Sequence, residues 1–177
     1  MSRVLAKIAD GLTLLRLAIA IVLAPLVTVG LWSTVAILMA LAWATDFADG
    51  RIARMAGGGT RLGRWDMSID TAVGASLLLG LIFQGVVPDW VGFALLVIFG
   101  FLHLKGNIAA SMLLQLAGFA PTLLILWEDR PDGWWSPFVA IVLIAVFDWR
   151  RLFFTNIPAF VRGLGGRFEG LWARPPS

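Results

Sequence analysis

Residues 46–70 read DFADGRIARMAGGGTRLGRWDMSID. The stretch holds four aspartates in two groups, three residues apart in the first and four in the second: Asp46, Asp49, Asp66 and Asp70. Because an α-helix has about 3.6 residues per turn, each group lies on one face of a helix. Small residues share these faces, Gly50 and Ala53 with the first pair and Gly63 with the second. The spacing predicts two helices whose acidic faces can meet.

The chain is far more apolar than a soluble domain. Of its 177 residues, 59% are hydrophobic and 14% are charged, and the mean hydropathy is +0.87. A bilayer crossing needs about 20 mostly apolar residues, so the long uncharged runs indicate membrane-spanning helices. These runs cover residues 17–45, 71–88, 90–102, 106–127 and 133–147.

The runs predict the fold class. The first is long enough for two crossings that turn near Gly30, and charged residues are tolerated at helix ends. We therefore expect an all-α integral membrane protein with six transmembrane helices, folded as a single domain over residues 1–177. Residues 1–10 carry Arg3 and Lys7 among apolar residues, which predicts a short juxtamembrane helix on the membrane surface. Arg16 is expected to snorkel from the first span to that surface.

The charged residues indicate orientation. The formal net charge is +3, and there is no cysteine, which excludes disulfides and cysteine-ligated metal sites. If the N-terminus is cytoplasmic, every Lys and Arg except Arg130 falls on the cytoplasmic side of the six-helix topology. We interpret the basic charge as a topology signal and not as a nucleic-acid surface. The multi-pass topology places both acidic helix segments at the cytoplasmic face.

Four carboxylates in an apolar protein need compensation, because one alone costs about 2.5–3.5 kcal/mol at the centre of a membrane helix. One interpretation is an interfacial charge network with Arg51, Arg54, Arg61 and Arg64. We favour divalent metal, since clustered carboxylates suit Mg²⁺ or Mn²⁺ and a pair of such ions about 3.5–4 Å apart serves phosphoryl transfer. The small residues on the acidic faces then leave room for a base or a phosphate.

The whole stretch resembles the signature of the CDP-alcohol phosphotransferase family: Asp46, then Asp49-Gly50-x-x-Ala53-Arg54, then Gly63, Asp66 and Asp70. The resemblance implies transfer from a CDP-linked donor, usually CDP-diacylglycerol, to an alcohol, with release of CMP. It also implies a homodimer, and bacterial relatives place the enzyme in the inner membrane.

The resemblance further implies a role for each residue of the signature. The four aspartates would hold two Mg²⁺ or Mn²⁺ ions on the diphosphate, and Asp70 would also be the general base. Gly50, Ala53 and Gly63 would line the cytidine pocket, with Arg54 near the nucleotide.

The acceptor is less clearly indicated. Residues 12–16, with Pro25 beyond them, are similar to the first helix of bacterial phosphatidylglycerophosphate synthases and cardiolipin synthases, whereas residues 57–63 look like the loop of phosphatidylinositol-phosphate synthases. Thr71 departs from both groups. We favour glycerol 3-phosphate, with inositol phosphate and phosphatidylglycerol as alternatives. A non-enzymatic cation-binding or transport protein is the alternative from another class.

A phosphorylated acceptor needs cations beside the site. The six-helix topology brings six basic or imidazole side chains to the correct depth, each of which is also explained as an ordinary cytoplasmic-side residue. They are Arg61, Arg64, His103, Lys105, Arg150 and Arg151.

Overall fold

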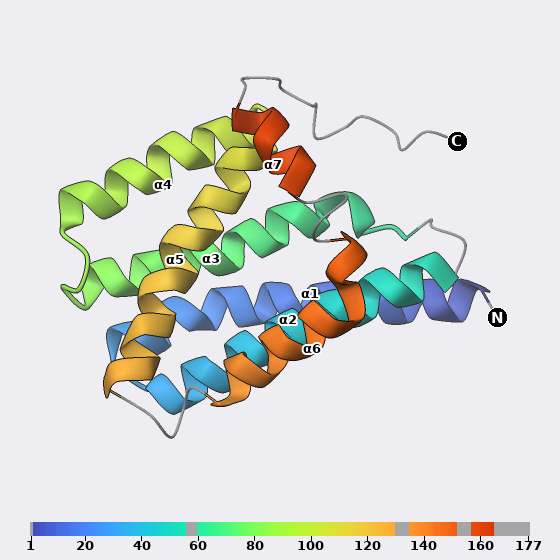
Figure 1. The fold of residues 1–177 in the computed structure, drawn as a ribbon, viewed down its shortest axis with the longest axis horizontal. Helices are drawn as coiled ribbons and strands as arrows, with labels where there is room; N and C mark the ends of the chain where they lie inside the picture. The colour runs from blue at the N-terminus through green and yellow to red at the C-terminus, as the bar shows by residue number, and fades with distance from the viewer. Residues whose placement is uncertain (1, 56–59, 130–134, 152–156, 165–177) are drawn as a thin grey trace.

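The computed structural model describes residues 2–55, 60–129, 135–151 and 157–164, and in this part of the chain all regular structure is helical (Figure 1). The helices are α1 (Ser2–Thr28), α2 (Trp32–Met55), the 3₁₀ turn η1 (Gly63–Trp65), α3 (Asp66–Phe83), α4 (Asp89–Leu104), α5 (Ile108–Asp129), α6 (Trp135–Arg151) and α7 (Ile157–Leu164).

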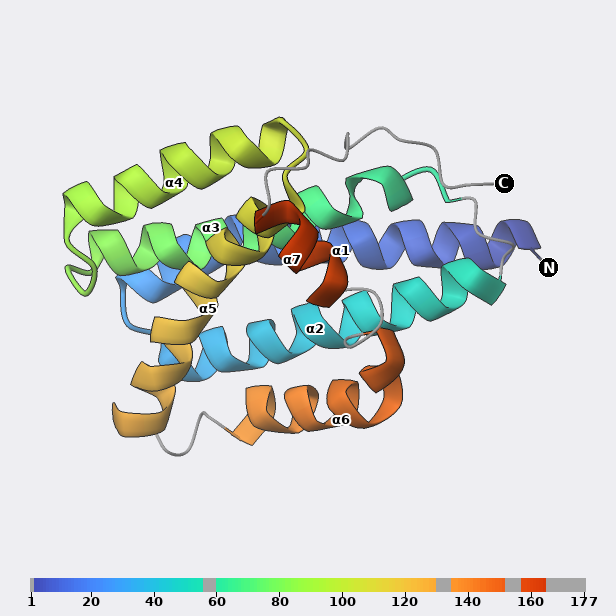
Figure 2. The same cartoon turned by 45° about the horizontal axis from the view of Figure 1, so that its top comes forward.

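Helix α1 is the hub of the bundle, because it packs along both α2 and α3. Helix α5 crosses α3 on the other side and also packs against α4 and α7. Helix α6 lies along α2 (Figures 1 and 2). The two helices that carry the aspartates are therefore bridged by a third helix, and each is backed by another.

The core lies where α1, α2 and α3 meet. Leu23 and Val27 of α1, Val35 and Met39 of α2, and Leu77 of α3 have no exposed surface. In α1 and α2 these residues are four positions apart, so they form one continuous stripe on each helix. Large apolar side chains on the outer faces of the bundle are exposed instead, as expected of surfaces that contact lipid.

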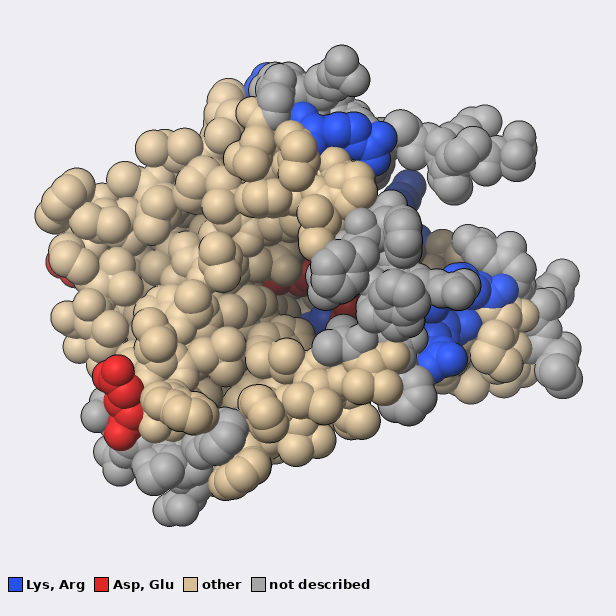
Figure 3. Space-filling view, viewed as in Figure 1, with Lys and Arg blue, Asp and Glu red and all other residues tan. Residues whose placement is uncertain are grey.

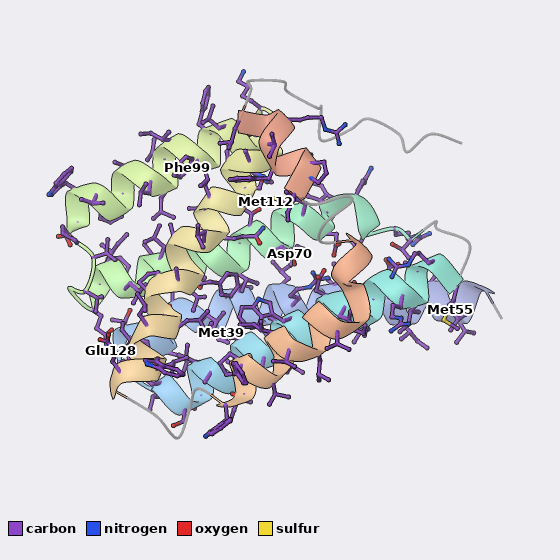
Figure 4. All side chains as sticks on the ribbon, in the orientation of Figure 1. Met39, Met55, Asp70, Phe99, Met112 and Glu128 are labelled. Carbon is purple, nitrogen blue, oxygen red and sulfur yellow. The ribbon has the colours of Figure 1, made fainter. Side chains whose placement is uncertain are left out.

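Within the described residues, three helical segments are long and apolar enough to cross a membrane: Val4–Thr28, Gly63–Phe83 and Ile108–Glu128. Asp89–Leu104 is a shorter apolar helix. The all-helical membrane class is thus supported, and the expected count of six spans is not confirmed. On the face shown in Figure 3, Lys and Arg lie mostly along the top and on the right, the side where the N-terminus lies in Figure 1, whereas Glu128 lies on the left (Figure 4).

The predicted surface helix at residues 1–10 leads directly into the first span, since α1 runs unbroken over 27 residues from Ser2. Nothing in residues 1–10 breaks a helix, so the surface turns continue into the apolar ones. One boundary differs from the sequence-based expectation, because Gly63 lies outside the third α-helix, in the 3₁₀ turn that precedes Asp66. The predicted glycine break at residues 57–59 falls outside the described residues.

The closest contact between α3 and α5 depends on glycine. A Cβ atom added to Gly74 would lie 2.5 Å from the Cα of Gln115, and one added to Gly118 would overlap the carbonyl oxygen of Gly74. Small residues allow this approach, and between membrane helices close packing replaces the hydrophobic effect as the main attraction. The position of α3 relative to α5 is therefore fixed by backbone contact.

We predict that Gly118→Ala destabilises the protein by about 1–3 kcal/mol, because the new methyl group must push α3 and α5 apart. Thermal unfolding in detergent measures the effect. Gly100→Ala in α4 is the matched control, since a Cβ there meets no atom within 4 Å and alanine is about 0.5–1 kcal/mol better than glycine in a helix. Equal melting temperatures for Gly118→Ala and Gly100→Ala would contradict the proposed contact.

Candidate active site

The four aspartates converge on one side chain, Arg16 of α1. Its Nη1 donates to Oδ1 of Asp46 at 2.6 Å and to Oδ1 of Asp70. Its Nη2 donates to Oδ2 of Asp49 and, at 2.7 Å, to Oδ1 of Asp66. Asp70 lies on the side of α3 that faces the bundle interior (Figure 4). One guanidinium thus joins two carboxylates of α2 to two of α3.

The expectation that Arg16 snorkels to the membrane surface is wrong. Its side chain is only 1% exposed and points into the bundle. Burying an arginine is costly unless charged partners offset the lost hydration, and four carboxylates supply that compensation here. The Nε–H is buried and has no acceptor among the described residues, an imperfection that costs about 1–3 kcal/mol.

The surface arginines considered as partners of the aspartates lie elsewhere. Arg51, Arg54, Arg61 and Arg64 are exposed. The guanidinium of Arg51 lies 5.0 Å from the ring centre of Phe47, and that of Arg64 lies 5.9 Å from the ring centre of Trp65. Arg16, by contrast, forms an ion pair with each of the four aspartates.

Two further polar residues of α1 support the site. The hydroxyl of Thr13 lies 3.1 Å from Oδ2 of Asp49, and Oδ1 of Asp10 accepts the backbone N–H of Leu62 at 2.9 Å. Asp10 thereby anchors the segment that leads into η1. We did not select Asp10, Thr13 or Arg16 as site residues from the sequence. Their spacing of three, which continues from the charged N-terminal turns into the apolar part of α1, is the signal that could have identified them.

The donor set fits a divalent cation. One carboxylate oxygen from each of Asp46, Asp49 and Asp66 can be chosen so that all three lie within 4.8 Å of one another. Clustered carboxylate oxygens are ligands that Mg²⁺ and Mn²⁺ prefer. Asp46, Asp49 and Asp66 therefore form a group that could hold a metal ion, and Asp70 bonds to the same guanidinium.

A cavity of about 70 Å³ adjoins the cluster. Its polar walls are Arg16, Asp46, Asp70 and Gln115, and its apolar walls include the rings of Trp43 and Phe119, whose centres are 5.1 Å apart. Asp70 therefore borders a space in which a small group can lie.

The CDP-alcohol phosphatidyltransferase family model matches residues 6–124. The chain belongs to this family. The match spans α1 to most of α5 and so includes the four aspartates, Arg16 and the cavity. No curated protein and no solved structure matches the chain significantly. This match confirms the family resemblance found in residues 46–70. Members of the family transfer a phosphatidyl group from a CDP-alcohol to an alcohol and depend on a divalent metal.

The expected nucleotide residues of this family member lie beside the cluster in sequence. Gly50 and Ala53 are half-buried on α2, while Arg54 and Gly63 are exposed. The backbone N–H of Gly63 donates to Oγ1 of Thr60 at 3.0 Å, and a Cβ added to Gly63 would lie 2.7 Å from that oxygen. Glycine at this position therefore preserves the turn that precedes Asp66.

The candidate acceptor residues occupy different environments. His103 is buried, with Nδ1 at 2.5 Å from Oγ of Ser111 and Nε2 at 3.2 Å from Oγ of Ser68, so it joins α4 to α5 and α3. Lys105 is exposed, with Nζ 5.4 Å from the ring centre of Phe101. The side chains of Arg150 and Arg151 lie outside the described residues. Neither His103 nor Lys105 lines the cavity.

We predict that Asp66→Asn weakens Mn²⁺ binding by about 100-fold or more, because loss of even an outer-shell partner of a metal site costs about 10–100-fold. Titration of the detergent-solubilised protein, followed by electron paramagnetic resonance of free Mn²⁺, measures the affinity. Asp89→Asn is the control, since Asp89 is an exposed acid in the first turn of α4. Unchanged affinity in Asp66→Asn would remove Asp66 from the metal ligands.

Proposed function

We propose that this chain transfers the phosphatidyl group of CDP-diacylglycerol to glycerol 3-phosphate and releases CMP. The observation that carries the proposal is the convergence of four aspartates from α2 and α3 on one point, in a member of a metal-dependent transferase family. The apolar bundle around this point suits a lipid-linked donor.

In the proposed site Asp46, Asp49, Asp66 and Asp70 hold two Mg²⁺ or Mn²⁺ ions. Bound there, the ions would offset the charge that develops on the diphosphate. Asp70 borders the cavity and acts as the general base. It takes the proton of the acceptor hydroxyl as that oxygen bonds to the lipid-bearing phosphorus, and the bond from this phosphorus to the CMP oxygen breaks.

The donor nucleotide is assigned to the exposed side of the cluster. Gly50 and Ala53 follow Asp49 on α2, and Gly63 precedes Asp66, so these small residues flank the aspartates where a cytidine ring needs room. Arg54 is exposed beyond them and can meet a phosphate.

The acceptor phosphate is assigned to exposed cations. Arg61 and Arg64 precede α3, and Lys105 follows the last residue of α4. Arg150 and Arg151 are included because the six-helix topology places them at the same depth. We leave His103 out, because serine hydroxyls occupy both of its ring nitrogens. A doubly charged acceptor such as glycerol 3-phosphate matches several cations better than a neutral alcohol does.

The setting proposed for this reaction is a bacterial inner membrane. We propose that all six long helices span it as one domain, that the aspartates face the cytoplasm, where CDP-linked donors and phosphorylated acceptors are made, and that the enzyme is a homodimer.

The test incubates the purified protein and Mg²⁺ or Mn²⁺ with CDP-diacylglycerol and each acceptor in turn. We expect metal-dependent CMP release and a lipid product with glycerol 3-phosphate. A product formed only with inositol phosphate or phosphatidylglycerol would replace the acceptor. No CMP release with any acceptor would overturn the enzyme assignment and leave a cation-binding protein.

Asp70→Asn tests the general base. We expect turnover to fall by about 100-fold or more, because a well-placed base contributes about 10²–10⁴-fold, while binding of the CDP-linked donor changes little. The assay pairs the CMP release rate with the donor dissociation constant, and Asp89→Asn again serves as the control. Retained turnover in Asp70→Asn would exclude Asp70 as the base.

A further inference from the structure

The guanidinium of Arg16 bonds to the same four carboxylates that are proposed to bind metal. Its terminal nitrogens carry four N–H donors, and each carboxylate accepts one of them. Nη1 bridges Asp46 to Asp70, and Nη2 bridges Asp49 to Asp66. Each nitrogen therefore joins one carboxylate of α2 to one of α3.

The guanidinium and the ions compete for the same place. A Mg²⁺ ion binds carboxylate oxygens at about 2.0–2.1 Å. An ion among the oxygens that now contact Arg16 would lie within a few ångströms of the guanidinium, and like charges this close inside a protein repel strongly. Arg16 cannot keep all four bonds when the aspartates bind metal.

Asp70 gives a second reason for Arg16 to move. Its Oδ1 accepts an N–H of Arg16. Movement of the guanidinium makes this oxygen available, in addition to Oδ2, to the acceptor hydroxyl or to a metal ion.

The cavity provides the space for this movement. Arg16 and Asp70 both border it, so rotation about the side-chain bonds of Arg16 is sufficient. One water needs about 10–15 Å³ of such space, so a cavity of about 70 Å³ has room for the four heavy atoms of a guanidinium. Gln115 offers an amide oxygen to accept N–H bonds, and Trp43 and Phe119 offer ring faces that attract cations.

We infer that Arg16 is a displaceable internal cation, which holds the four carboxylates together before metal binds and moves its guanidinium beside Gln115 when metal takes its place. In this role Arg16 is a positioning residue and makes no contact with substrate. The inference rests on the proposed function, because it takes the four aspartates as the metal ligands.

The first test compares Mn²⁺ binding and stability in the full-length wild type and Arg16→Gln. Without its competitor the site binds Mn²⁺ about tenfold more tightly, within the usual range of coupling between two ligands. In EDTA the melting temperature of Arg16→Gln falls by about 10 °C, because the carboxylates have lost their cation. Arg16→Lys, with three donors in place of five, binds Mn²⁺ with intermediate affinity and serves if Arg16→Gln does not fold.

The second test fills the cavity. Ala42 is buried and lines it, so Ala42→Val blocks the movement of Arg16 and weakens Mn²⁺ binding by about fivefold or more. In the Arg16→Gln background the same change leaves the affinity within about twofold, since no guanidinium has to move. Ala36→Val is the matched control, because Ala36 is buried on the same helix and does not line the cavity.

Weaker Mn²⁺ binding in Arg16→Gln would overturn the inference, as would an equal effect of Ala42→Val in both backgrounds. Either result, in a wild type that binds Mn²⁺ and releases CMP, leaves the proposed function intact. A wild type that binds no Mn²⁺ overturns both.

Discussion

Four carboxylates inside an apolar helix bundle repel one another, and the rest of the structure depends on how that repulsion is offset. Asp46, Asp49, Asp66 and Asp70 come from two helices, and a cation between them offsets their repulsion. Arg16 supplies this cation from a third helix, α1, which also packs apolar residues against both α2 and α3.

Helix α3 is also held by contacts on the side away from Arg16. Gly74 and Gly118 bring α3 and α5 into backbone contact, and His103 bonds to Ser68, which lies on α3 between Asp66 and Asp70. Chemistry at a two-metal site requires carboxylates that are held firmly in place. Helix α3 is therefore fixed by charge on one side and by close packing and hydrogen bonds on the other.

Local patterns were reliable wherever the physical cause was local. The bounds of α4 and α5 agree closely with the apolar runs, and the aspartates of each pair lie on one helix and bond to one guanidinium, as their spacing predicts. Departures arose where the cause was not local. Arg16 is buried because its four partners come from α2 and α3, and His103 is part of a buried network because Ser68 and Ser111 come from other helices.

The sequence by itself determined the membrane class, the family and the grouping of the four aspartates into two pairs. Composition, helical period and signature spacing can all be counted along the chain. Only the tertiary structure decided that Arg16, and not Arg51, Arg54, Arg61 or Arg64, lies among those aspartates. Sequence distance gave no guidance, since Arg16 is 30 residues or more from every carboxylate it binds. The pairing follows from the packing of α1 between α2 and α3, which brings the four carboxylates around a guanidinium that water does not reach.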